Sequence, residues 1–330
     1  MEITEMKVGQ KITADLVLAG ASIRQTKSIP PRNFLTLDLS DGKNTLDGKI
    51  WNYDANQGVP EKGKVYTVSG IIGEYQGKKQ VTLDGFHLAD NQDLVRFLPQ
   101  YTADVQKVYD AALRLMDAIQ NNQLKLFCKS IYTTMEQALK TSSSALGVHH
   151  VGVGGNLVHC YEVACMAAAL GEQARAAGYA VNLDLCIAGG LLHDIGKCQT
   201  YTYDGATVAM TSDGQLLDHI VLGIEIIDKY AVQWHAEGYT LDWLPWLKHV
   251  IASHHGELEY GSPVFPLCME AYLVNLADKA SSTLAMIKSA NDKAELEKQQ
   301  MTDRIFTLHN RPHFLQSTIQ HDMSGVKQNG

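Results

Sequence analysis

The sequence predicts a multidomain α+β protein in which an N-terminal five-stranded β-barrel precedes an all-helical domain. Two observations support this fold class. Residues 1–92 hold short runs of alternating apolar and polar residues, separated by turns that contain glycine. From residue 93 onward, apolar residues instead recur every three or four positions, which is the period of an amphipathic helix. With 330 residues the chain is long enough for both units, which we expect at 1–92 and 93–330.

The first unit has the strand pattern of a small barrel. Its clearest alternation is Phe34-Leu35-Thr36-Leu37-Asp38-Leu39, and the three residues that follow, Ser40-Asp41-Gly42, have the composition of a turn. The expected strands cover residues 12–23, 34–39, 46–51, 65–75 and 80–88. Five short strands joined by such turns favour a closed barrel over an open sheet.

Segments 34–42, 47–51 and 68–70 together resemble the OB-fold of the anticodon-binding type. Barrels of this type bind single strands through aromatic side chains that stack on bases and cations that contact phosphates. The resemblance implies substrate contacts by Phe34, Trp51, Arg24 and Lys49, with Tyr53, Tyr75, Lys27 and Arg32 as further candidates. Each of these aromatics has an alternative role in the barrel core or at its rim.

The second unit is expected to be helical. Helical spacing covers residues 105–119, 124–139, 157–177, 184–197, 215–233, 242–255 and 267–290. Asn156 is the expected N-cap of the helix at 157–177, and 200–213 reads as a variable connection. Gly189 and Gly190 lie inside the helix at 184–197, where each costs about 1 kcal/mol relative to alanine. Their presence suggests that another helix packs closely there.

Polar residues occupy apolar helix faces at several places in this unit. His193 and Asp194 follow Gly190-Leu191-Leu192, where burial without partners would cost several kcal/mol. A single adjacent histidine and aspartate could also lie at a half-exposed helix end. The same setting recurs along the helices that precede and follow it, however, at His159, His219, His254, His255 and Asp278. Such a set is best explained by a metal ion.

A glycine-rich segment, 147–156, precedes the helix that carries His159. Free backbone amides at a helix start form an anion site, so Gly155 is expected to face a phosphate of the substrate. His149 and His150 belong to the same segment, and two roles stay open for them: contact with the substrate, or support of the metal ligands.

His159, His193-Asp194 and Asp278 match the metal-binding signature of the HD phosphohydrolase superfamily, and His219 with His254-His255 matches its two-metal branch. With the barrel in front, residues 5–315 resemble the YhaM family of 3'-5' exoribonucleases. The resemblance implies hydrolysis of single-stranded RNA from its 3' end to nucleoside 5'-monophosphates, with single-stranded DNA as a second substrate candidate. It also implies a homo-oligomer and favours Mn²⁺.

We assign one ion to His159, His193, Asp194 and Asp278, and a second to His219, His254 and His255, with Asp194 bridging the two. Ligands of this kind suit Fe²⁺, Co²⁺, Zn²⁺ or Mg²⁺ as well as Mn²⁺. Two ions about 3.5 to 4 Å apart would activate a water and clamp the oxygens of a phosphodiester displacement. Lys197, one turn after His193, is expected to reach a phosphate oxygen; its alternative role is that of an ordinary cation near a helix C-terminus.

Composition limits the other possibilities. A net charge of −8 argues against binding of nucleic acid by charge alone. Six cysteines without a CxxC pair indicate a reduced, cytoplasmic protein, and a membrane span or signal peptide is not expected. Two alternative functions remain: an HD-type phosphohydrolase of small or cyclic nucleotides, and a nucleic-acid-binding, replication-associated factor with a structural or vestigial metal site.

Overall fold

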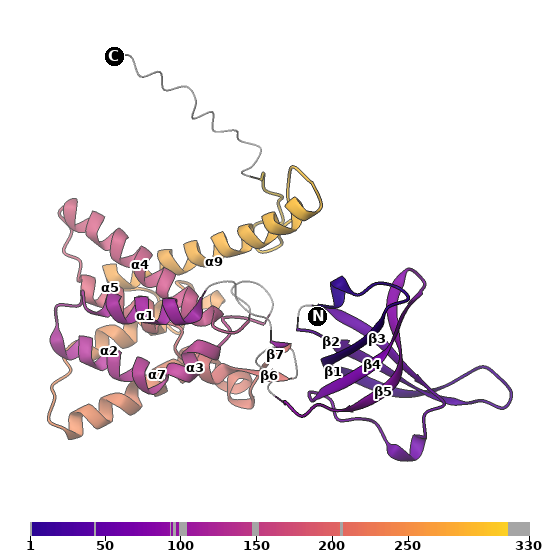
Figure 1. Cartoon of the computed structure of the whole chain (residues 1–330). Coiled ribbons are helices and arrows are strands. Elements are labelled where there is room, and N and C mark those ends of the chain that lie inside the picture. Colours follow the sequence, from indigo (N-terminus) through magenta and orange to yellow (C-terminus); the bar gives the residue numbers. More distant parts are fainter. Residues whose placement is uncertain are drawn as a thin grey trace, which may run out of the picture.

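The computed structural model describes residues 2–42, 44–92, 94, 97–98, 104–146, 152–204 and 207–315. A β-barrel and a helical body are distinct in Figure 1. Within the described ranges, no helix combines the length and the hydropathy needed to cross a bilayer. The expected fold class, a barrel followed by a helical domain, is confirmed.

The barrel consists of β1 (Lys11–Gln25), β2 (Asn33–Ser40), β3 (Thr45–Trp51), β4 (Val65–Tyr75) and β5 (Lys78–Leu88). The strands close in the order β1-β2-β3-β5-β4, with β3 and β5 parallel and the other neighbours antiparallel. This is the arrangement of a five-stranded OB-type barrel. Leu35, Leu37 and Leu39 alternate into its interior and are fully buried, which explains why alternation located β2 correctly.

The helical domain contains α1 (Val105–Met116), α2 (Asn122–Thr134), α3 (Glu136–Thr141), α4 (Gly155–Ala176), α5 (Leu183–Leu192), α6 (Lys197–Thr200), α7 (Ser212–Ala236), α8 (Leu244–Ser253) and α9 (Met269–Leu296). The expected variable connection at 200–213 instead holds a two-stranded hairpin, β6 (Tyr201–Asp204) and β7 (Thr207–Met210). The expected helix at 124–139 divides into α2 and α3, because the backbone of Met135 leaves the helical conformation.

Two details near the expected site differ from the sequence prediction. Gly154, with φ 79°, is the N-cap residue of α4, whereas Asn156 lies buried in the first turn and donates its Nδ2 to the Asp194 carbonyl oxygen at 3.1 Å. The helix expected at 184–197 ends at Leu192, and Asn182 caps its start through hydrogen bonds from the backbone of Asp184 and Leu185. The second difference places His193 and Asp194 just after the last residue of α5.

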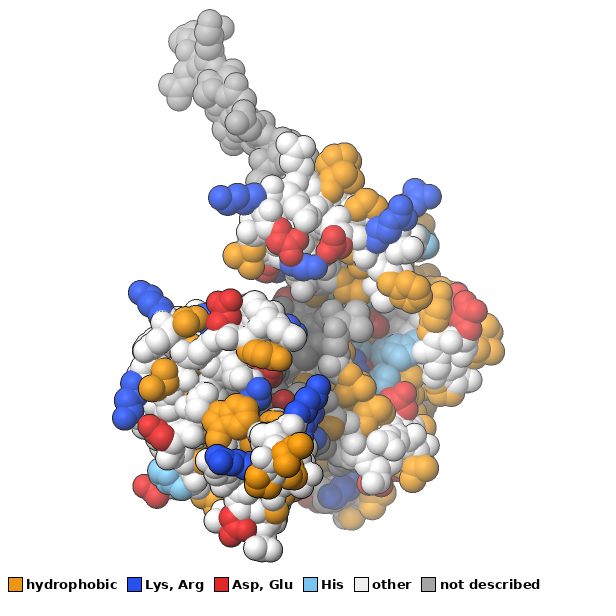
Figure 2. Space-filling view, turned by 90° about the vertical axis from the view of Figure 1, so that its right-hand side faces the viewer, with side chains coloured by type: hydrophobic (Ala, Val, Ile, Leu, Met, Phe, Trp, Pro, Cys, Tyr) orange, Lys and Arg blue, Asp and Glu red, His pale blue; other side chains and the backbone are white. Residues whose placement is uncertain are grey.

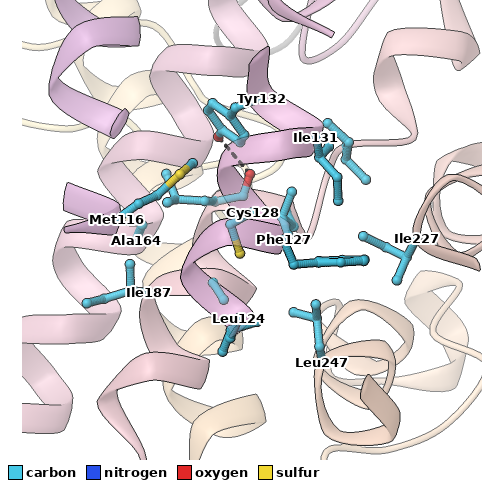
Figure 3. Packing of buried hydrophobic residues seen from close by; sticks show 14 of the residues in the cluster. Met116, Leu124, Phe127, Cys128, Ile131, Tyr132, Ala164, Ile187, Ile227 and Leu247 are labelled. Carbon is cyan, nitrogen blue, oxygen red and sulfur yellow. Dashed lines mark hydrogen bonds between the residues drawn. The ribbon is translucent and has the colours of Figure 1, made fainter. Parts of the chain in front are cut away.

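The largest hydrophobic core of the helical domain supports the segment that leads to His193. Phe127, Ile131 and Tyr132 of α2 are fully buried in it, as Figure 3 shows. The Tyr132 hydroxyl donates to the Leu191 carbonyl oxygen at 2.9 Å. A buried hydroxyl of this kind needs a partner, so this hydrogen bond ties α2 in the core to the end of α5.

Candidate metal centre

Five helices bring imidazoles and carboxylates to one place. His159 comes from α4, His193 and Asp194 follow α5, His219 lies in α7, His254 and His255 follow α8, and Asp278 comes from α9. All seven side chains are buried or partly buried. The sequence predicted this set, and the structure places its members in mutual reach.

The first group surrounds the Nε2 atom of His159. This atom lies 3.0 Å from Asp278 Oδ1, 3.4 Å from His193 Nε2 and 3.5 Å from Asp194 Oδ2. His193 Nε2 is itself 3.3 Å from Asp194 Oδ2. Two nitrogens and two carboxylate oxygens thus converge on one small volume.

The second group lies on the other side of Asp194. His219 Nε2 and His255 Nε2 are 3.3 Å apart. Asp194 Oδ1 lies 3.5 Å from His219 Nε2 and 3.6 Å from His254 Nε2. One oxygen of Asp194 therefore faces each group, which is the arrangement of a bridging carboxylate.

The opposite ring nitrogens hold the imidazoles in one tautomer. The Nδ1 atoms of His193, His254 and His255 contact the carbonyl oxygens of Gly190, Ile251 and Tyr260 at 2.7 to 2.8 Å. His159 Nδ1 lies 3.0 Å from Ser281 Oγ, and that hydroxyl donates to Glu162 Oε2 at 2.8 Å. His219 Nδ1 lies 2.6 Å from Asp218 Oδ1. These acceptors require a proton on Nδ1, which leaves the Nε2 lone pairs directed at the centre.

This arrangement fits divalent metal ions. Without a cation or a proton between them, the lone pairs of His159 Nε2 and His193 Nε2 would repel at 3.4 Å. Asp194 Oδ1 is buried without a hydrogen-bond partner among the described residues, which is costly for an ionised oxygen. Nitrogen and carboxylate donors without thiolate suit the first-row divalent ions named above. The described residues thus hold buried His/Asp clusters consistent with a divalent metal centre.

The charges at the centre keep its ligands available. Burial raises the pKa of Asp194, but Lys197 and His193 outweigh it and hold that pKa well below its usual value. Burial and the nearby His193 lower the pKa of His254 well below its usual value. Asp194 is therefore ionised and His254 neutral at pH 7, the forms in which both bind metals.

Lys197 lies at the start of α6 and contacts Asp194. It begins α6 instead of ending a helix, and its Nζ lies 2.5 Å from Asp194 Oδ2, with only 9% of its side chain exposed. Burial lowers the pKa of Lys197, yet the Asp194 carboxylate reverses this and raises it. The carboxylate of Asp194 is thus the partner that the buried ammonium group of Lys197 requires.

Glycines set the approach of the helices. A Cβ atom at Gly190 would lie 2.4 Å from the Cα of Ala164 in α4, whereas one at Gly189 would meet the Val250 side chain of α8. Gly190 therefore faces the helix of His159, whereas Gly189 faces α8. Gly196 is equally constrained, because its Cβ would lie 1.9 Å from the carbonyl oxygen of His219.

The candidate nucleic-acid residues of the barrel lie close together. The rings of Phe34 and Trp51 are 5.0 Å apart, and Lys49 Nζ lies 5.5 Å from the Trp51 ring and 5.0 Å from that of Tyr75. Arg24, Lys49 and Tyr75 line a groove of about 570 Å³. Figure 2 views the molecule from the barrel side and shows cationic side chains interspersed with apolar ones.

Other candidates are placed differently. Tyr53 packs against the barrel core and donates its hydroxyl to the Gly58 carbonyl oxygen, which is the alternative role stated above. Gly155 is the first residue of α4, while His149 and His150 lie outside the described residues. Sequence reasoning did not identify Asp218, although its position directly before His219 was a usable signal.

Comparisons with known proteins agree with this geometry. The HD domain family profile matches residues 156–283. The 3'-5' exoribonuclease YhaM of Oceanobacillus iheyensis is 27% identical over 310 residues, covering 92% of this chain and 93% of the relative. YhaM of Bacillus subtilis is 26% identical over 315 residues, covering 92% and 95%.

Among solved structures, a domain of replication protein A from Methanococcus maripaludis aligns with 28% of this chain and 97% of its own, at 20% identity and a TM-score of 0.24.

The HD match spans His159, His193, Asp194, His219, His254, His255 and Asp278, and the YhaM matches extend through the barrel as well. The chain therefore contains an HD domain behind an OB-type barrel, and it is similar to the YhaM exoribonucleases over nearly its whole length.

Proposed function

We propose that this protein is a metal-dependent 3'-5' exoribonuclease that shortens single-stranded RNA to nucleoside 5'-monophosphates. The observation that carries the proposal is the carboxylate of Asp194, which faces His159 and His193 with one oxygen and His219 and His254 with the other. The YhaM relatives, similar over nearly the whole chain, are named 3'-5' exoribonucleases. Single-stranded DNA is the second substrate to be tested.

The proposed ligands are those predicted from the sequence. His159, His193, Asp194 and Asp278 would hold one divalent ion, and His219, His254 and His255 would hold the second, with Asp194 shared and Mn²⁺ favoured. When bound, such ions supply an activated water and stabilise charge on the phosphodiester. Lys197 keeps Asp194 ionised between the two groups, so we propose that its main role is electrostatic support of the bridge.

We further propose that residues 1–92 bind the RNA and residues 93–330 cleave it, in the cytoplasm. Trp51 is 47% exposed and Tyr75 is 60% exposed, which leaves ring surface for bases to stack on. Lys49 lies between these rings, where it can contact a phosphate. Aromatic rings with an adjacent cation are the usual elements of single-strand binding.

The test compares linear and circular RNA of one sequence, with Mn²⁺. The 5'-labelled linear RNA is expected to shorten progressively from its 3' end, releasing nucleoside 5'-monophosphates, and EDTA should stop the reaction. The circular RNA, which has no 3' end, should stay intact. Hydrolysis of bis-p-nitrophenyl phosphate and nucleotides with both RNAs untouched would instead assign the small-nucleotide function.

Trp51→Ala is expected to weaken RNA binding. Loss of one stacking partner costs about 1–3 kcal/mol, which corresponds to roughly 5- to 150-fold in Kd. Binding is measured by fluorescence anisotropy with a labelled oligonucleotide in EDTA, so that no cleavage occurs. Ile71→Ala, which also changes an exposed apolar residue of the barrel, serves as the control and should leave Kd within twofold. Equal Kd values for both variants would refute the proposed binding face.

A further inference from the structure

Asp218 has a backbone conformation that is unusual inside a helix. It lies within α7, yet its φ is 58° and its ψ is 169°. This region of backbone space is adopted readily by glycine and is strained for residues with a Cβ. Its side chain is 65% exposed, so burial of the side chain does not offset this strain.

The strained backbone allows two short contacts with the next residue. Asp218 Oδ1 accepts the backbone N–H of His219 at 2.6 Å and also lies 2.6 Å from His219 Nδ1. Among the described histidines of the centre, His219 is the one whose Nδ1 contacts a carboxylate directly. The others contact carbonyl oxygens or, in His159, the Ser281 hydroxyl.

The contact determines what His219 presents to the centre. A carboxylate that holds the proton on Nδ1 fixes the tautomer and the orientation of the imidazole, and it leaves Nε2 as a lone-pair donor. That Nε2 atom lies 3.3 Å from His255 Nε2 and 3.5 Å from Asp194 Oδ1. A change at Asp218 should therefore act on the group of His219, His254 and His255, and should have less effect on the group around His159.

We propose that Asp218 is a positioning residue that strengthens the binding of a divalent cation by His219, His254 and His255, at the expense of fold stability. The inference rests on the proposed function, because it assumes that this group holds the second ion. Strain that persists at an exposed residue beside a functional site is expected when the site depends on it. A glycine at this position would relieve the backbone and remove the carboxylate, so stability and cation affinity should change in opposite directions.

The experiment compares wild type, Asp218→Gly and Asp218→Asn by Mn²⁺ titration in a calorimeter and by thermal unfolding in EDTA. Asp218→Gly is expected to raise the dissociation constant of the second Mn²⁺ ion about 10- to 100-fold. It should also raise the Tm of the metal-free protein by about 2–4 °C. Asp218→Asn, which keeps an oxygen acceptor and tolerates positive φ better than most residues, should give an intermediate Mn²⁺ constant.

Lys298→Gly is the matched control, because Lys298, two residues after the end of α9, also has a positive φ, 56°. Like Asp218→Gly, it should raise Tm, but it should leave the dissociation constants of both Mn²⁺ ions unchanged. This inference alone would be overturned if wild type binds two Mn²⁺ ions and Asp218→Gly keeps the same dissociation constant for the second ion. A lower Tm for that variant would also overturn it. Wild-type protein that binds a single Mn²⁺ would overturn the proposed two-ion centre, and this inference with it.

Discussion

Asp194→Asn is expected to lower the rate of RNA shortening by about 10³-fold or more and to reduce bound Mn²⁺ to one ion per chain or fewer. The carboxylate faces both ligand groups, with Oδ2 3.3 Å from His193 Nε2 and Oδ1 3.5 Å from His219 Nε2. An amide offers one weak oxygen donor and no charge, so it cannot serve both groups. Metal ions contribute several kcal/mol to such reactions, and each 1.36 kcal/mol is tenfold in rate.

This substitution also affects folding, and the design must separate the two effects. Lys197 Nζ lies 2.5 Å from Asp194 Oδ2, and the lysine side chain is buried. Removal of one partner of a buried ion pair costs about 3–5 kcal/mol, because the other charge is left uncompensated. The double variant Asp194→Asn with Lys197→Met removes both charges, and is expected to recover much of the thermal stability without recovering activity.

The measurements are Tm by circular dichroism, bound metal by elemental analysis, and shortening of 5'-labelled RNA. Asp228→Asn, which removes a carboxylate from the Lys248 ion pair elsewhere in the domain, should behave as wild type in all three. If Asp194→Asn is folded and shortens RNA at a tenth of the wild-type rate or faster, Asp194 is not the shared ligand.

Local patterns were sufficient to predict most elements of the fold. The strands of the barrel were located to within three residues, because alternation along β2 and its neighbours records which side chains face the interior. The caps were less predictable. Asn156 is a good N-cap residue by composition, yet it donates to Asp194 O, 38 residues away in sequence. Contacts of that range leave no local signal.

The candidate site shows the same division. His159 and Asp278 could be selected from the sequence because a polar residue on an apolar helix face requires a partner. The contact of Lys197 with Asp194 could not be predicted, since it depends on the backbone turning after Leu192 and on the start of α6 at that lysine. Asp218 was missed although it directly precedes His219, because the contact between the two depends on a backbone conformation that helical periodicity does not reveal.

Gly190→Ala is expected to weaken Mn²⁺ binding at the His159 group about 10- to 100-fold, the range seen when the support of a ligand is lost, and Gly190→Leu should weaken it further. The added Cβ would lie 2.4 Å from Ala164 Cα and 2.7 Å from Ala164 N. These are backbone atoms of α4 that cannot rotate away, so α4 and α5 must separate. His159 and His193 belong to these two segments, and their Nε2 atoms now lie 3.4 Å apart.

Gly171→Ala supplies the matched control, because it places a methyl group on α4 where the nearest atom, at 2.7 Å, is Leu183 Cδ2 at the end of a side chain. Replacement of a helical glycine by alanine favours the helix by about 1 kcal/mol, and here the neighbour can move. Gly171→Ala should therefore keep Mn²⁺ affinity and hold or raise Tm. At Gly190, overpacking should destabilise the fold by about 1–3 kcal/mol or more. This cost should exceed the gain in helix propensity, so Tm should fall. Unchanged Mn²⁺ affinity in Gly190→Ala would mean that the distance between His159 and His193 is set by contacts other than the packing of α4 on α5.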